Sequence, residues 1–132
     1  MYLSIFLFIF LNFFIINGRV QKIEVKGRIL CQGKPLQFLD IKLKEEDFFF
    51  DDILDKNFTS ENGNFELSGE DDEIFNIQPY IQFTYVCCEY FENCQHDTKV
   101  LTLPNNLTSF SKHKILYNFG DIDFHKPLHI IN

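Results

Sequence analysis

The chain has 132 residues, and its 12 lysine and arginine residues against 19 aspartate and glutamate residues give a formal net charge of −7. Such acidity disfavours nucleic acid or an anionic membrane as an electrostatic partner, so neither is expected. The length suits one domain with a single core.

The N-terminal segment has the pattern of a secretory leader. Residues 3–16 consist mainly of Leu, Ile and Phe, carry no charge and are followed by Asn17-Gly18. This pattern is typical of a signal peptide, although basic residues are missing from its start. The run is shorter than the about 20 apolar residues that a membrane-spanning helix needs, and an uncleaved anchor is the alternative. We therefore predict a cleaved leader over residues 1–18, one domain over residues 19–132, no transmembrane segment after leader removal, and a secreted, extracellular protein.

Alternating apolar and polar residues follow the leader. Residues 23–31 alternate in the way that predicts a half-buried strand, with Cys31 on the inner face. Residues 32–35 supply turn chemistry through Gly33 and Pro35. A second alternating run covers residues 39–43, and we expect the two strands to form a hairpin.

Residues 45–55 contain six carboxylates around the triplet Phe48-Phe49-Phe50. Calcium takes six to eight oxygen ligands, but the spacing does not fit an EF-hand loop and its glycine is absent. A solvated loop that blunts a strand edge is the preferred interpretation. At least one of the three phenylalanines should face solvent unless a partner covers it, which makes Phe48, Phe49 and Phe50 candidate contact residues.

The middle of the chain has a strong turn signal. Asn62-Gly63 lies between the short runs 58–59 and 65–67, which predicts a second hairpin. The acidic residues 70–73 then lead towards Ile74, where one helical turn is expected.

Three strands are predicted in the last part of the chain. In residues 81–88 the alternation assigns Cys87 to the inner face and Cys88 to the outer face. Further strands are expected at residues 99–103 and 115–124. Short strands separated by turns, with no convincing long helix, indicate an all-β antiparallel sandwich.

All four cysteines follow the leader, and they are Cys31, Cys87, Cys88 and Cys94. An even number of cysteines in a small exported chain predicts two disulfides, whose pairing the sequence does not fix. A zinc site is disfavoured because no C-x-x-C pair is present, so we expect no metal and no cofactor. Two N-x-[ST] sequons predict glycosylation at Asn57 and Asn106.

The ordered motifs along residues 24–124 resemble the nematode transthyretin-like family of secreted proteins. The matching residues are, in chain order, Val25-Lys26-Gly27, Cys31 to Pro35, Lys42 to Asp47, Asp51 to Asp55, Thr59 to Phe65 (T-x-x-x-G-x-F), Leu67-Ser68-Gly69, Glu73, and Pro79 to Phe83 leading to Cys87 and Cys94. The resemblance implies a disulfide-linked transthyretin-like (prealbumin-like) β-sandwich of about seven to eight strands. It also implies extracellular binding of a protein receptor, a host protein, or a lipid or other hydrophobic ligand. Some members resemble bridging molecules between phosphatidylserine and phagocyte receptors, a role that fold similarity alone does not transfer.

The resemblance also favours a disulfide pairing. If the strands lie as in a transthyretin-like sandwich, Cys31 and Cys87 share one end of the core, and Cys88 is left for Cys94. The alternative, Cys87 with Cys94 and Cys31 with Cys88, has nearly equal weight, and a bridge between Cys87 and Cys88 is disfavoured by strain.

This chain departs from the family pattern at two positions near the cysteines. Tyr85 stands where the family commonly has His, and His96 where it has Arg. Any role of that His or Arg is therefore not carried over. Tyr85 and the Cys88–Cys94 loop form a second candidate contact surface.

Catalysis is not expected. The related-fold 5-hydroxyisourate hydrolases use active-site His and Arg residues and a C-terminal Tyr-Arg-Gly-Ser, whereas this chain ends in His129-Ile130-Ile131-Asn132 and has Arg only at positions 19 and 28. We predict a secreted binding protein, with a structural component of extracellular matrix or cuticle as the alternative. The sequence does not predict the oligomeric state.

Overall fold

The computed structural model describes residues 2–13, 19–73, 78–88, 94–107 and 114–124. The elements are, in chain order, α1 (Tyr2–Phe13), β1 (Arg19–Cys31), β2 (Lys34–Pro35), β3 (Asp40–Glu45), β4 (Asp52–Phe58), β5 (Asn64–Glu73), β6 (Pro79–Cys88), β7 (Cys94–Thr102), the 3-10 turn η1 (Asn105–Leu107) and β8 (Lys114–Phe124). Within these ranges no helix is long and apolar enough to cross a membrane. The strand content confirms the predicted all-β class.

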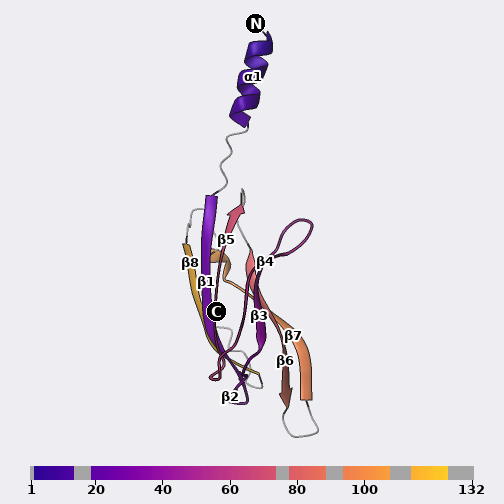
Figure 1. Cartoon of the computed structure of the whole chain (residues 1–132), viewed down its shortest axis with the longest axis vertical. Coiled ribbons are helices and arrows are strands. Elements are labelled where there is room, and N and C mark those ends of the chain that lie inside the picture. Colours follow the sequence, from indigo (N-terminus) through magenta and orange to yellow (C-terminus); the bar gives the residue numbers. More distant parts are fainter. Residues whose placement is uncertain (1, 14–18, 74–77, 89–93, 108–113, 125–132) are drawn as a thin grey trace.

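The first sheet is built around β1, which has partners on both edges (Figure 1). β5 pairs antiparallel with residues 19–28 of β1, and the short β2 pairs with the last two residues of β1. β8 runs parallel to β1, an exception in a sandwich that was expected to be antiparallel. β1 is therefore the strand that holds this sheet together.

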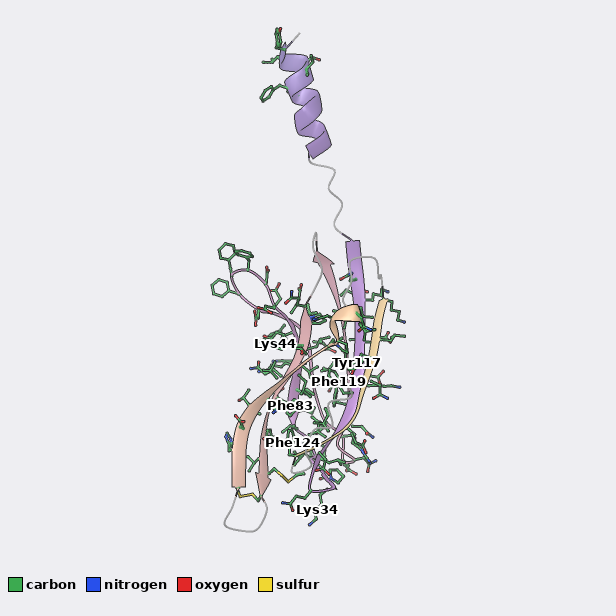
Figure 2. The ribbon with its side chains drawn as sticks, turned by 180° about the vertical axis from the view of Figure 1, so that it is seen from behind. Lys34, Lys44, Phe83, Tyr117, Phe119 and Phe124 are labelled. Atoms are coloured by element: carbon green, nitrogen blue, oxygen red, sulfur yellow. A yellow bond between two sulfur atoms is a disulfide. The ribbon has the colours of Figure 1, made fainter. Side chains whose placement is uncertain are left out.

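The second sheet is antiparallel throughout, in the order β4-β3-β6-β7. The two sheets pack face to face, and their inward side chains form one core. Figure 2 shows Phe83, Phe119 and Phe124 between the sheets, and Phe83 and Phe124 have ring centroids 5.8 Å apart. The alternation in β6 is confirmed, because Ile81, Phe83 and Cys87 are buried whereas Cys88 is exposed.

Both predicted hairpins are wrong. β1 and β3 belong to different sheets, as do β4 and β5, so each turn carries the chain across the sandwich. The second turn itself is present, because Gly63 has φ 77° and its amide donates to Ser60 O at 2.9 Å. Turn residues fix where the chain reverses, but the pairing partner depends on the distant strands that form each sheet.

Two segments expected to be irregular are strands. Residues 52–55, predicted as part of the acidic loop, open β4. Residues 70–73 extend β5 instead of starting a helical turn. The long β1 stabilises this acidic end, since Lys22 pairs with Glu70 in the ladder and their side chains lie 3.3 Å apart.

Two disulfides close one end of the sandwich. Cys31 of β1 is bonded to Cys87 of β6, which links the two sheets. Cys88 is bonded to Cys94, its direct partner in the β6–β7 ladder. These are the pairs that the family resemblance favours.

Candidate binding site

The connection between β3 and β4, residues 46–51, extends away from the two sheets (Figure 1). We call it the β3–β4 loop. Its three phenylalanines are almost fully exposed, with fractions of 94% for Phe48, 86% for Phe49 and 84% for Phe50. The rings of Phe48 and Phe49 contact each other edge to face, with centroids 6.0 Å apart. The folded chain therefore presents three neighbouring aromatic rings to solvent, in agreement with the prediction that at least one of them would be exposed.

Hydrogen bonds fix both ends of this loop. The amide of Glu46 donates to the carbonyl oxygen of Gln78 at 3.2 Å, immediately before β6. At the other end, the hydroxyl of Tyr80 donates to a carboxylate oxygen of Asp51. The loop thus leaves the sandwich from two anchored points next to β6.

The Tyr80 hydroxyl titrates in an unusual environment. Partial burial, followed by the hydrogen bond to Asp51 and the negative charge of Asp51 and Glu46, raises the pKa of Tyr80 to about 12. The Lys44 ammonium lies 5.8 Å from the centroid of the Tyr80 ring. Tyr80 therefore stays neutral, and remains the donor to Asp51, throughout the physiological pH range.

Carboxylates flank the three aromatic rings on both sides. Glu46, Asp47, Asp51 and Asp52 are all exposed, and Asp47 accepts a hydrogen bond from the amide of Phe48 at 2.6 Å. No group of three or more His, Cys, Asp or Glu side chains in the described ranges is arranged to hold a metal ion. The loop is thus a set of apolar anchors inside a negatively charged rim.

A buried carboxylate lies at the base of the loop. Glu45, the last residue of β3, is only 1% exposed, and its Oε2 has no hydrogen-bond partner. It follows Ile41 and Leu43 on the inward face of β3. A buried acceptor without a donor carries a desolvation penalty, so this position costs stability.

Tyr85 is not a contact residue in this fold, contrary to expectation. It is 6% exposed and its ring stacks on Phe124 with centroids 3.8 Å apart. The reason is strand parity, since Tyr85 shares the inner face of β6 with Phe83 and Cys87. The rest of that second surface, residues 89–93, lies outside the described residues.

The residues weighed for hydrolysis are not gathered in the described part of the chain. His96 is exposed on β7, and Arg28 donates two hydrogen bonds to Asp121, at 3.0 and 2.6 Å, which raise its pKa. His113, His125 and His129 lie outside the described residues. Arg28 thus joins β1 to β8 and faces Asp121, not a histidine.

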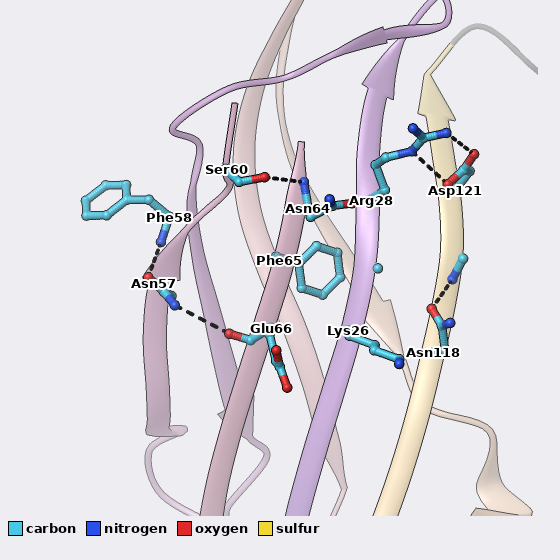
Figure 3. A pocket seen from close by; sticks show the side chains of 12 residues that line it. Lys26, Arg28, Asn57, Phe58, Ser60, Asn64, Phe65, Glu66, Asn118 and Asp121 are labelled. Atoms are coloured by element: carbon cyan, nitrogen blue, oxygen red, sulfur yellow. Dashed lines mark hydrogen bonds and ion pairs between the residues drawn. The ribbon is translucent and has the colours of Figure 1, made fainter. Parts of the chain in front are cut away.

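An open depression of about 580 Å³ lies across β4, β5, β1 and β8 (Figure 3). Polar and apolar surface contribute about equally to its lining, and the polar side chains there include Lys26, Arg28, Asn64, Glu66 and Asn118.

A β-bulge shapes the floor of this depression. β8 places Phe119 and Gly120 opposite Gly27 of β1, and Gly120 has φ 67°. The ring of Phe65 occupies the space above Gly27, where a Cβ would lie 2.8 Å from its Cζ. Sequence reasoning missed this feature, although a glycine inside each of two strand patterns is the signal of a bulge or a close approach.

The two sequons have exposed asparagines. Asn57 lies on β4 at the rim of the depression, and Asn106 lies in η1. Thr108, the last residue of the second sequon, is outside the described residues.

Two sheets, two disulfides and an exposed aromatic loop define a small disulfide-bonded β-sandwich protein. A family model described as "Transthyretin-like family" matches residues 26–102. The chain belongs to the transthyretin-like family, which confirms the resemblance.

Relatives from Caenorhabditis elegans align over most of the chain. Transthyretin-like protein 2 is 33% identical over 113 residues, which cover 80% of this chain and 76% of the relative. Transthyretin-like protein 5 is 32% identical over 107 residues, which cover 80% and 77%. Among solved structures, a 9R-lipoxygenase from Cyanothece PCC8801 aligns with 79% of this chain and 16% of its own, at 19% identity and a TM-score of 0.47.

Proposed function

We propose that the protein is a secreted, non-catalytic binding protein, formed by residues 19–132 after removal of residues 1–18, and that the β3–β4 loop is its contact surface. One observation carries the proposal: Phe48, Phe49 and Phe50 are between 84% and 94% exposed at one loop. Three adjacent exposed rings cost solubility unless a partner covers them. Aromatic side chains are also the usual anchors of protein interfaces.

The charges of the loop favour one kind of partner. Four carboxylates surround the rings, and the whole chain has a net charge of −7. An anionic lipid surface repels such a loop, whereas an extracellular protein with an apolar pocket and a basic rim complements it. A neutral lipid or another hydrophobic ligand is the competing occupant.

The test compares two variants of the exported protein in a pull-down from extracellular fluid and in binding to phosphatidylcholine vesicles. Full burial of one phenylalanine contributes about 1.5–3 kcal/mol. Replacing Phe49 and Phe50 by Ser should therefore weaken binding by about 100-fold or more, at 1.4 kcal/mol per factor of ten.

The matched control is Phe38→Asn, which removes a 64% exposed phenylalanine from a different turn. Its φ of 54° suits Asn, so the fold should be kept. Equal capture by the loop variant and the control would rule out the loop as the contact surface. Binding that appears only on vesicles would assign the loop to lipid and not to protein.

A structural role in extracellular matrix or cuticle is the second candidate, and the sheet edges favour it. β7 and β8 each pair with a single strand among the described residues, so each has one edge free of a ladder there. Such edges can add strands from other chains. Immunolocalisation in insoluble matrix supports this role, whereas recovery in fluid counts against it.

A further inference from the structure

The first sequon lies where β4 meets β5. The side chain of Asn57 accepts a hydrogen bond from the amide of Phe58 at 2.9 Å and donates from Nδ2 to Glu66 O at 3.5 Å (Figure 3). The second bond is at the limit of length, so it holds Nδ2 weakly. Asn57 is exposed, and it forms part of the rim of the depression. Its amide nitrogen is thus open to a substituent that extends over β5 and β1.

The threonine of the same sequon has the opposite environment. Thr59 is 1% exposed; its hydroxyl donates to Leu36 O at 2.6 Å and accepts from the amide of Leu39 at 2.8 Å. Its backbone amide also donates to Leu39 O at 2.9 Å. An enzyme that reads Asn-x-Thr needs this hydroxyl, and the folded chain hides it. The sequon is therefore readable only before the segment 36–39 packs against Thr59.

From this pair of environments we propose that Asn57 carries an N-linked glycan, that it is attached before the domain folds, and that the first sugar lies in the depression. This inference depends on the proposed secretion, because N-glycosylation takes place on the secretory route.

In the reaction, Nδ2 of Asn57 loses one proton and forms a bond to C1 of N-acetylglucosamine. The bond between C1 and the pyrophosphate of a lipid-linked oligosaccharide breaks, and the lipid pyrophosphate leaves. One N–H remains on Nδ2 and can still donate to Glu66 O.

The lining of the depression suits a sugar. The ammonium group of Lys26, the amide of Asn64 and the carboxylate of Glu66 can form hydrogen bonds with the hydroxyl and acetamido groups of a sugar. At the floor of the depression the Phe65 ring packs over Gly27, which offers an apolar surface beside these polar groups. A glycan that begins at Asn57 would cover Lys26, which lines the depression, more than Lys34, which lies on β2 and is not part of the lining.

The experiment expresses the full chain in a eukaryotic secretory host, both with its own first 18 residues and with these exchanged for a leader of established export. The exchanged leader separates the two proposals. If the chain with its own leader is not exported but the chain with the exchanged leader is, the secretion proposal is contradicted, and the glycan can still be measured on the exported chain. Intact mass and peptide mapping, before and after peptide N-glycosidase treatment, locate the glycans. We expect a glycan at Asn57, its loss in Asn57→Gln, and its retention in the matched control Asn106→Gln.

Variants of Thr59 separate recognition from folding. Thr59→Ser keeps a hydroxyl and should keep the glycan, whereas Thr59→Val loses both the glycan and stability. Purified oligosaccharyltransferase should modify the reduced, unfolded chain but not the folded one.

Acetylation of lysines tests the position of the sugar. The acetylation rate of Lys26 relative to Lys34 should be lower in the glycosylated protein than in Asn57→Gln. An exported, folded chain with unmodified Asn57 would overturn the proposal, as would efficient modification of the folded chain. An unchanged Lys26 rate would overturn the position of the sugar in the depression.

Discussion

The two disulfides should contribute unequally to stability because they close loops of different length. The bond between Cys31 and Cys87 spans a sequence separation of 56, and that between Cys88 and Cys94 a separation of 6. Loop-closure entropy of the unfolded chain gives about 4 kcal/mol for the first and about 2 kcal/mol for the second at 25 °C. The two loops adjoin without overlapping, so their effects should add approximately.

Removal of each pair tests this difference. Replacing Cys31 and Cys87 by Ala should lower the free energy of unfolding by about 4 kcal/mol or more. Because Cys87 is fully buried, the cavity left by Ala adds to the loss. Replacing the exposed Cys88 and its partner Cys94 by Ser should cost about 2 kcal/mol.

Guanidinium unfolding at pH 7, followed by circular dichroism, measures both losses, with a separate slope fitted for each variant because removing a cross-link expands the unfolded state. Equal losses, or a larger loss for the Cys88–Cys94 pair, would refute the reasoning. Peptide mapping without reduction gives an independent check, since a Cys31 peptide linked to anything other than Cys87 contradicts the pairing.

Further substitutions test three local features. Gly27→Ala should lower the free energy of unfolding in urea by about 1–3 kcal/mol, because the added methyl group overpacks the Phe65 ring. Adding Phe65→Leu to the same chain should recover part of this loss, whereas additive losses of the two substitutions would contradict the contact. Because the pKa of Tyr80 is raised to about 12, this residue stabilises the fold below pH 10, and the contribution is lost as the pH rises from 10 to 12. Absorbance titration should therefore lose one tyrosine that ionises at a pH of about 12 in Tyr80→Phe, and Asp51→Asn should shift the ionisation of Tyr80 to lower pH; an unchanged curve counts against the hydrogen bond. Glu45→Met removes a buried acceptor that has no partner and should raise the free energy of unfolding at pH 7 by about 1–3 kcal/mol, so a decrease would show that the carboxylate is satisfied.

Features that depend on neighbouring residues were predictable from the sequence. Alternation in residues 81–88 assigned each side chain of β6 to a face, because strand parity is a local property. The same parity places Tyr85 beside Cys87 on the inner face, so its departure from the family pattern does not make it a surface residue.

Features that depend on distant partners were not predictable. The turn at Gly63 gave a correct reversal, but nothing nearby indicates that β4 and β5 belong to different sheets. Residues 70–73 are acidic and were expected to lead into a helical turn, whereas their ladder with the start of β1 makes them a strand. The depression arises in the same way, from the approach of Gly27 and Gly120 across two strands that are far apart in the chain.

The β3–β4 loop and the disulfides lie at opposite ends of β6. Pro79, at the start of this strand, pairs with Glu45 at the base of the loop, and Cys88, at its other end, carries a disulfide. Figure 2 shows the sulfur bridges at the end of the sandwich away from that loop. The cross-links therefore restrict the unfolded chain without constraining the exposed rings. Adjacent carboxylates favour the solubility of these exposed rings, and the loop can vary in sequence without loss of the core.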